Sequence, residues 1–362
     1  MYIGHFAPFA PARCGLYEAA RDMAKADILA GHGVLFFDTG IINDNKQDEP
    51  QVGKQDNRAG FSINVSSLNE INNLDVIIAH TGINDNWIVK TEAPIVWVVH
   101  GRPLACFRPE LMGKNNSFSL YENISKWPRV KKMLYFWPEF TPYWENVFPE
   151  NKLHSLEYPC VDNARFCPDG NKYEFKSKGK YNILLCDSMR EDIDNFELVN
   201  GLIEAVRQLP GIKIHFFGSL DLPLPNCWNI VLNKLKDIGG LGDIVGRITN
   251  IEDVYRSADL VASPNRIITR TIGESILCGT PVLCQQGNKV GTYQCDVAYA
   301  KEVVEAVRLF ITHKDQNINF VEEMTKLHKL FSFENYSKEM DVIYNDLSHK
   351  QNREVYETIK AK

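Results

Sequence analysis

The chain has 362 residues, of which 44% are hydrophobic and 24% charged, an ordinary balance for a globular protein long enough for two domains. Its formal net charge of −6 provides no overall basic field, so composition does not favour general binding to nucleic acid or to an anionic membrane. No run of about 18 apolar residues is present and the first residues lack a signal-peptide pattern, so we expect a cytoplasmic protein with nine reduced cysteines.

The first part of the sequence alternates between helical and extended patterns. An apolar stripe with helical spacing occupies residues 16–32. Nearly continuous, β-rich apolar runs follow at 33–40, 74–80 and 94–101. Such runs are typical of parallel strands that are covered on both faces. The polar stretch 43–58 predicts an exposed loop.

The alternation restarts near residue 180. Strands are predicted at 180–188, 212–219, 243–248, 259–264 and 280–285. Helices are predicted at 195–211, 250–258, 272–279 and 331–347. The helix at 195–211 closes at a Pro-Gly pair, which is a common stop signal.

This alternation predicts the α/β class, with two doubly wound, parallel-sheet, Rossmann-like domains facing a cleft. We place an N-terminal domain at 1–158 and a second domain at 159–331. The final segment, 332–362, is expected to be a helix that packs back toward the N-terminal domain. Ligands of such sheets bind at the carboxyl ends of the strands, although the architecture alone does not indicate a function.

Several residues lie where such a ligand would bind. Gly15 opens the first helix, where its backbone would let a phosphate approach, or it serves only a tight turn. His100 ends one predicted strand and Arg190 follows another, and each also has an ordinary structural or surface reading. Asp162, four residues before Phe166, suits the cap of a helical turn. The dinucleotide pattern G-x-G-x-x-G is absent from the first loop.

Together these stretches resemble the large family of retaining, nucleotide-sugar-dependent glycosyltransferases with the two-Rossmann glycosyltransferase B fold. The resemblance spans nearly the whole chain and is carried by "CGLYEAARDMAKADILAGHGV", "VVHG", "YPCVDNARFCPD", "GRITNIEDVYRSADLVASP" and "GESILCGTPVLC". The last two blocks are the most specific, because their order, spacing and composition all agree with the family's donor-site signature.

The resemblance implies transfer of a sugar from a nucleoside diphosphate to an acceptor hydroxyl, with retention. His100 and Glu274 would be the catalytic residues, with Glu274 at the donor ribose or the equivalent region. The donor-binding residues would be Gly15, Arg190, Gly218, Arg266, Arg270, Thr271 and Ile272. Protein groups would offset the diphosphate charge, and no metal-spaced cluster stands in the sequence, so we expect no metal and no cofactor besides the nucleotide sugar as substrate.

Two departures from the family pattern concern positive charge. The family usually has two glutamates eight positions apart, but the residue eight positions before Glu274 is Arg266, which cannot accept a hydrogen bond. Arg266 therefore meets a donor phosphate or an acidic donor or acceptor, or it faces solvent on a re-registered loop. The lysine usually found about six residues after Arg190 is also missing. One hypothesis is that Arg266 and Arg270 replace the positive charge of the missing lysine. The other hypothesis is that the two departures reflect an enzyme that has lost its activity.

The acceptor is less well indicated. Residues 125–144, "SKWPRVKKMLYFWPEFTPYW", interleave aromatic and basic side chains that would stack on sugars or bases, meet phosphates or lie on a membrane, or would simply form a core strand. The acceptor-side candidates are Arg102, Trp127 and Lys131.

The nature of the acceptor and the exact reaction stay open at this point. The acceptor is a glycan, a lipid, a protein or modified DNA of the phage hydroxymethylpyrimidine type, although net charge indicates neither membrane nor DNA contact. The sequence does not indicate an oligomeric state. A phosphorylase or epimerase of the same fold and a non-catalytic scaffold that binds sugar nucleotides remain the alternative functions.

Overall fold

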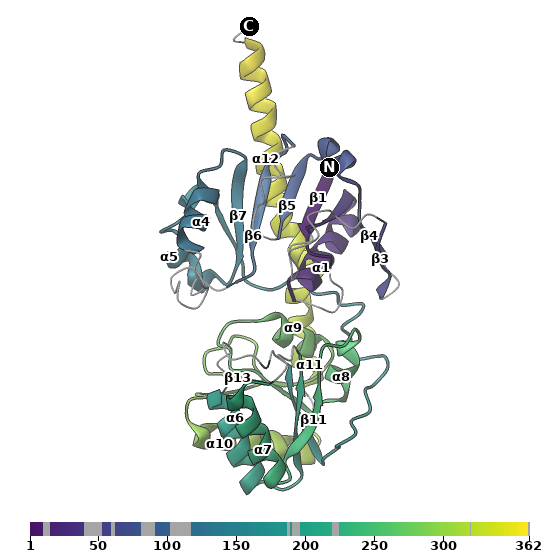
Figure 1. Ribbon diagram of the computed structural model, residues 1–362, viewed down its shortest axis with the longest axis vertical. Coiled ribbons are helices and arrows are strands. Elements are labelled where there is room, and N and C mark those ends of the chain that lie inside the picture. Colours follow the sequence, from purple (N-terminus) through teal and green to yellow (C-terminus); the bar gives the residue numbers. More distant parts are fainter. Residues whose placement is uncertain are drawn as a thin grey trace. The chain divides into compact units, whose positions relative to one another are not determined.

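The computed structural model describes residues 1–9, 15–39, 53–58, 62–80, 91–101, 117–186, 189, 196–218, 224–318 and 320–360. The chain forms two compact units (Figure 1). Unit 1 contains Met1–Cys160 and Ser332–Lys362, and unit 2 contains Val161–Phe331. Unit 2 is therefore one continuous segment inserted into unit 1.

Unit 1 is built on a parallel sheet of six strands in the order β2-β1-β5-β6-β7-β8. The strands are β1 (Tyr2–Ala7), β2 (Gly33–Asp38), β5 (Val76–Ala79), β6 (Ile95–Val99), β7 (Val130–Phe136) and β8 (Leu153–Leu156). Short 3-10 helices are η2 (Leu68–Asn73), η4 (Pro138–Phe140) and η5 (Glu150–Lys152). The central strands β5 and β6 are buried throughout, as their continuous apolar runs predict.

Helices cover both faces of this sheet. The helices are α1 (Gly15–Leu29), α4 (Ser117–Ser125), α5 (Thr141–Trp144) and α12 (Phe333–Lys360). Met23 of α1 and Met340 of α12 pack against Ile78 and Val98 on one face. Trp144 of α5 packs in the core of the opposite face. The helix α12, drawn in yellow in Figure 1, thus brings the last part of the chain onto unit 1 beside α1.

The predicted exposed loop at 43–58 is only partly confirmed at its described end, 53–58, where four of the six residues are exposed. There β3 (Gln55–Asp56) pairs antiparallel with β4 (Ile63–Asn64), and Asp56 is buried. Its carboxylate accepts hydrogen bonds from the Tyr17 hydroxyl at 2.6 Å and from Arg21 Nε at 3.0 Å. Hydrogen bonds from two side chains of α1 thus make burial of the Asp56 carboxylate possible. The polar composition of the stretch does not reveal this burial.

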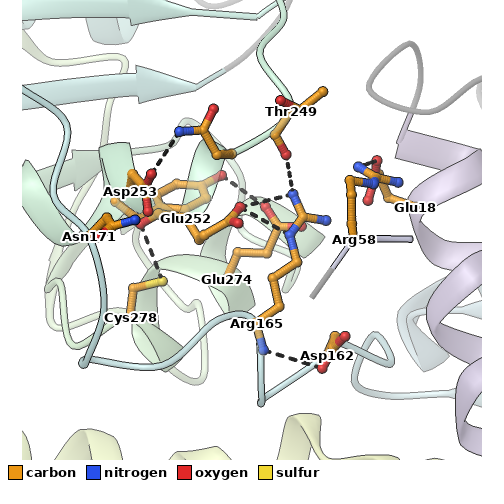
Figure 2. A network of polar contacts seen from close by, with 12 residues as sticks. Glu18, Arg58, Asp162, Arg165, Asn171, Thr249, Glu252, Asp253, Glu274 and Cys278 are labelled. Carbon is orange, nitrogen blue, oxygen red and sulfur yellow. Dashed lines mark hydrogen bonds and ion pairs between the residues drawn. The ribbon is translucent and has the colours of Figure 1, made fainter. Parts of the chain in front are cut away.

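Arg58 completes this cluster and keeps Asp56 ionised. Its Nη2 donates to Asp56 at 2.7 Å, and its Nη1 pairs with Glu18 at 2.6 Å, as Figure 2 shows for the second pair. Burial raises the pKa of Asp56, but hydrogen bonds from Arg58 and Tyr17 outweigh burial and lower it well below its ordinary value. These contacts therefore fix the β3–β4 pair to the first turn of α1.

Unit 2 repeats the architecture with a parallel sheet in the order β11-β10-β9-β12-β13-β14. The strands are β9 (Tyr181–Cys186), β10 (Ile212–Phe217), β11 (Leu241–Val245), β12 (Leu260–Ala262), β13 (Val282–Gln285) and β14 (Tyr293–Cys295). The helices are α6 (Phe196–Gln208), α7 (Asn226–Asp237), α8 (Ile251–Ser257), α9 (Arg270–Leu277), α10 (Ala300–Asp315) and α11 (Val321–His328), followed by the 3-10 helix η6 (Lys329–Phe331).

One continuous apolar core supports the strand ends of unit 2. Trp228 of α7 and Phe310 of α10 are fully buried in it, together with Leu202 of α6. Gly201 makes the packing of α6 on α10 possible, since an added Cβ would lie 2.6 Å from Val303. These contacts make a rigid base for the loops that follow the strands.

The two parallel sheets confirm the predicted α/β class and the Rossmann-like architecture of each half. The strands predicted at 33–40, 74–80, 94–101, 180–188 and 212–219 are all present, each somewhat shorter than its apolar run. In the described residues no helix is long and apolar enough to cross a membrane.

Candidate functional site

The loop after β12 and the first turn of α9 together contain four of the seven predicted donor-binding residues, Arg266, Arg270, Thr271 and Ile272. Glu274 lies in α9 and is only 7% exposed. Its Oε1 accepts a hydrogen bond from Arg270 Nε at 2.6 Å, and its Oε2 accepts one from the Tyr255 hydroxyl at 3.0 Å. Burial, with further contributions from Cys186 and Glu274, holds the pKa of Tyr255 well above its ordinary value, so this hydroxyl stays a donor. The carboxylate is therefore held in one position from two sides.

Arg270 is shared between this carboxylate and an aromatic ring. Its guanidinium carbon lies 5.8 Å from the ring centroid of the buried Phe166, while Arg165 lies 4.7 Å from the same ring. Since the charge of Arg270 is already offset by Glu274 within α9, Arg270 is a weaker phosphate candidate than its sequence position suggests.

Arg266 is placed differently from Arg270. It is exposed, and among the described residues it makes no hydrogen bond or ion pair. Its side chain lies against the turn that follows β13: an added Cβ on Gly287, which has φ +86°, would be 3.0 Å from Arg266 Nε. Exposure agrees with the expectation of a solvent-facing side chain; contact with a phosphate stays a prediction.

Asn288 joins the Arg266 loop to the turn after β13. Its buried side-chain amide donates to the carbonyl oxygens of Asn265 and Ile267 at 3.3 and 3.2 Å. Its Oδ1 accepts from the backbone N–H groups of Val290 and Gly291, both at 3.0 Å. One side chain thus fixes two loops at the carboxyl ends of neighbouring strands, and the sequence analysis missed it because an Asn in a turn is commonplace.

The N-terminus of α9 adds backbone donors to this loop. Its first N–H groups, which include those of Thr271 and Ile272, have no acceptor one turn earlier in the helix. The Ile272 side chain is fully buried, so only its backbone could meet a ligand. At the N-cap, the hydroxyl of Thr269 is buried and has no hydrogen-bond partner among the described atoms. Such a terminus attracts anions.

Gly218 lies at the end of β10, at the same carboxyl edge of the sheet. Its φ of +145° is a conformation that other residues rarely adopt, and its N–H donates to the carbonyl of Val245 at 3.2 Å. The glycine is therefore required by the backbone, whether or not a donor lies beside it.

The segment that enters unit 2 is fixed by a polar network, shown in Figure 2. Asp162 Oδ1 accepts from the N–H groups of Ala164 and Arg165, which confirms the predicted cap. Arg165 then donates from Nη2 to the carbonyl of Thr249 at 2.8 Å and from Nε to Glu252 at 3.0 Å. This network positions the ring of the next residue, Phe166, on which Arg270 rests.

In unit 1, His100 follows β6 at the carboxyl edge of the sheet. It is half-buried, and its Nε2 lies 3.0 Å from Nδ1 of His80. Its ring centroid is 5.4 Å from that of Phe136, the last residue of the neighbouring strand β7. His100 therefore lies at the edge where ligands of parallel sheets bind, and its catalytic role stays a prediction.

Gly15 is the first residue of α1 and is exposed. Its φ is not among the positive values, and an added Cβ would meet no described atom within 4 Å. Neither backbone conformation nor packing against the described residues therefore calls for a glycine here. A ligand that approaches the backbone closely would explain it, and this stays a prediction.

The acceptor-side candidates Trp127 and Lys131 are not brought together with His100. Trp127 precedes β7 and packs partly against the core, and Lys131 is the extra residue at a register shift between β6 and β7. Both lie at the start of β7, whereas His100 follows the end of the parallel strand β6. The core-strand reading of "KMLYF" is confirmed by β7. Arg102 and Arg190 lie outside the described residues.

An aromatic row lies at the other end of β7, inside the aromatic stretch 125–144, but the sequence analysis named none of its residues as candidates. Trp137 is half-buried and has φ +71°, a strained value for a bulky side chain. Its ring meets Phe136 at 5.9 Å and Phe140 at 5.9 Å, and Phe140 meets the exposed Tyr143 at 6.3 Å. The row begins at the ring that touches His100.

Comparisons with known proteins give a result at the level of the fold. No family model matches the chain, and no curated protein matches its sequence. A sucrose-phosphate synthase from Thermosynechococcus elongatus is similar in structure, with 13% identity, a TM-score of 0.67 and coverage of 97% of this chain and 100% of that one. The chain has the glycosyltransferase B fold.

Two further solved structures agree with this fold assignment. A glycosyltransferase from Rickettsia africae has 15% identity and a TM-score of 0.65, over 96% of this chain and 98% of that one. Anabaena HepE, solved in complex with UDP and glucose, has 12% identity and a TM-score of 0.64, over 95% of this chain and 99% of that one. Within the described ranges of the chain, no group of three His, Cys, Asp or Glu side chains could hold a metal ion, and metal independence stays a prediction.

Proposed function

We propose that the chain is a glycosyltransferase that moves a sugar from a nucleoside diphosphate sugar to an acceptor hydroxyl, with retention and without a metal ion. The observation that carries the proposal is the loop between β12 and α9. Together with the start of α9, this loop combines an exposed Arg266, which has no ion pair among the described residues, the first N–H groups of the helix and the buried carboxylate of Glu274, within one short stretch of a glycosyltransferase B fold. The resemblance of this stretch to the donor-site signature supports the same proposal.

Each part of the loop suits one part of a nucleotide sugar. A diphosphate leaving group gains negative charge as the glycosidic bond breaks, and preorganised cations and N–H donors stabilise that charge. Arg266 supplies the cation and α9 supplies the N–H groups. The Asn288 hydrogen bonds to Asn265 and Ile267 hold the backbone on either side of Arg266, so little ordering of this loop is needed when the donor binds.

Glu274 takes the role of hydrogen-bond acceptor for the donor. Arg270 and Tyr255 each donate to one of its carboxylate oxygens, and a carboxylate oxygen can accept more than one hydrogen bond. Ribose hydroxyl groups donate hydrogen bonds of this kind. Arg270 then acts on the donor mainly by holding Glu274, rather than as the principal phosphate ligand.

On the acceptor side, we assign the stacking surface to Trp137 rather than to Trp127. Trp137 lies at the carboxyl end of β7, next in space to Phe136 and hence to His100. Aromatic faces of this type stack on apolar faces of ligand rings. A glycan acceptor is the first to test; a lipid, a protein or modified DNA would be recognised by other contacts.

Donor binding tests the proposal directly. UDP is the first nucleotide to try, because HepE was solved with UDP and glucose. Calorimetry of UDP and of uridine should be compared for the wild type and for Arg266→Ala. A charge-assisted contact contributes roughly 1.5–3 kcal/mol, so UDP affinity should fall by about 10- to 100-fold while uridine affinity hardly changes.

Arg308→Ala is the matched control, since Arg308 is an exposed arginine on α10 of the same unit. It should leave UDP affinity unchanged. If Arg266→Ala also leaves it unchanged, or if no nucleoside diphosphate binds, the donor-site assignment is wrong. Sugar release that depends on inorganic phosphate would identify a phosphorylase, and binding without any donor turnover would identify a scaffold.

A further inference from the structure

A row of three histidines crosses the sheet of unit 1 and ends at His100. His5 lies in β1, His80 follows β5 and His100 follows β6. In the sheet register His5 lies opposite Ile78, which is two residues before His80 on β5. The register of β5 with β6 continues to place His80 opposite Val98, which is two residues before His100. Since residues two apart share a face, all three rings lie on one face and rise stepwise to the carboxyl edge.

Hydrogen bonds connect the three rings to a buried carboxylate. His100 Nε2 lies 3.0 Å from His80 Nδ1, and His80 Nε2 lies 3.0 Å from His5 Nδ1. His5 Nε2 lies 2.8 Å from Oδ2 of Asp27 in α1, which also accepts from the Tyr344 hydroxyl at 3.0 Å. His5, His80 and Asp27 are at most 1% exposed, so water does not compete for these bonds.

The arrangement is a chain rather than a cluster. His80 directs its two ring nitrogens at different neighbours, so the three rings do not converge on one point as metal ligands do. Burial, with the neighbouring rings of His100 and His5, holds the pKa of His80 well below its ordinary value. The His80 ring is therefore neutral, so one of its nitrogens donates a hydrogen bond and the other accepts one.

The Asp27 carboxylate sets the direction of these hydrogen bonds. A carboxylate only accepts, so His5 donates from Nε2, and its Nδ1 is then an acceptor when the ring carries one proton. His80 must donate to it from Nε2, which leaves His80 Nδ1 as an acceptor for the Nε2–H of His100. With one proton on each ring, this is the only arrangement that satisfies every bond in the chain.

We propose that Asp27, His5 and His80 are positioning residues that keep the proton of His100 on Nε2, so that Nδ1 of His100 accepts a hydrogen bond from a hydroxyl of the bound sugar. The second half of this statement rests on the proposed function; the first half does not. Without the chain, a histidine at a strand end would exchange between its two tautomers, and only one of them offers an acceptor at Nδ1.

The test is nitrogen-15 NMR of the histidine rings in the full chain at neutral pH, where protonated and bare nitrogens are distinguished. The wild type is expected to show His100 protonated at Nε2 and bare at Nδ1. Asp27→Ala removes the acceptor of the His5 Nε2–H group, so nothing fixes the direction of the chain and a large share of His100 should carry its proton on Nδ1. Turnover at saturating donor should fall about tenfold or more, as expected for one lost hydrogen bond in the transition state.

His154→Gln is the control, because His154 of β8 pairs with Glu339 of α12 at 3.3 Å and lies outside the chain of rings. It should leave the His100 tautomer and the turnover unchanged. A wild-type His100 with its proton on Nδ1, or an unchanged tautomer in Asp27→Ala, overturns the relay. If the tautomers behave as expected but no nucleotide sugar binds or reacts, the relay stands and the sugar contact is refuted together with the proposed function.

Discussion

Replacing Asn288 by alanine should destabilise unit 2 and weaken donor binding together. The side chain makes four hydrogen bonds, two donated to carbonyl oxygens at 3.2–3.3 Å and two accepted from N–H groups at 3.0 Å. Each such bond contributes roughly 0.5–1.5 kcal/mol, and the two longer ones lie at the low end, so the set amounts to about 3 kcal/mol. In Asn288→Ala all four backbone groups lose these hydrogen bonds.

The magnitude converts to a measurable change in melting temperature. For a unit of this size, 1 kcal/mol shifts Tm by roughly 2–4 °C, so a fall of about 10 °C is expected in calorimetric scans. The Arg266 loop also loses its tie to the turn after β13, so UDP affinity should fall about tenfold because the loop must be ordered on binding.

Asn229→Ala is the matched control. Asn229 is an exposed asparagine that donates a single hydrogen bond to the carbonyl of Leu224, so its loss should change stability by no more than about 0.5 kcal/mol. A Tm shift of less than about 2 °C in Asn288→Ala, with unchanged UDP affinity, would refute the idea that this side chain organises the donor loop.

Three further outcomes are expected. Burial lowers the pKa of His215 to about 4, and its Nδ1 already accepts a hydrogen bond from the Asp243 N–H. As the pH falls, the unfolded chain therefore binds a proton at His215 before the folded chain does, and the free energy of unfolding decreases. Between about pH 6.5 and pH 4 the wild type should lose about 3 kcal/mol more stability than His215→Gln in urea titrations. In Glu274→Gln one oxygen can still accept from Arg270, but the amide NH2 group cannot accept from Tyr255 and the charge is lost, so Tm should fall while sugar transfer falls at least about tenfold; near-normal transfer would remove Glu274 from the site. Transfer should survive EDTA, and loss that Mg²⁺ or Mn²⁺ restores would contradict a metal-free reaction.

Sequence reasoning recovered those parts of the fold that depend on continuous apolar runs. β5 and β6 are buried from end to end, so their composition indicates both strand and parallel pairing. Asp162 was also recognisable, because capping depends on residues that are neighbours in the chain. Local patterns of this kind require no knowledge of which segments meet in space.

The site was only partly predictable, because its decisive contacts join distant segments. Arg266 was singled out from a motif, but its exposure depends on where Gly287 and Asn288 fold back. Trp127 and Trp137 stand in one aromatic stretch, of which the sequence analysis named only Trp127; the strand boundaries place Trp137 at the edge where His100 lies. His5 and His80 carried no motif, and their connection to His100 appears only when β1, β5 and β6 align.

The insertion of unit 2 within unit 1 has a consequence for synthesis of the protein. The Tyr344 hydroxyl that binds Asp27 belongs to a residue 317 positions later in the chain. While the chain emerges from the ribosome, the sheet of unit 1 lacks α12, so Ile78 and Val98 keep part of their apolar face uncovered. Unit 2 is complete earlier, since it is one continuous segment.

The order of folding should therefore differ from the order of residues. The strands of unit 1 are synthesised first but would remain only partly folded until α12 has been synthesised. During that interval a chaperone that binds apolar surface would act on them. A chain shortened to end at Phe331 should contain a protease-resistant unit 2 beside a protease-sensitive first half. The histidine chain would then be among the last features of the protein to form.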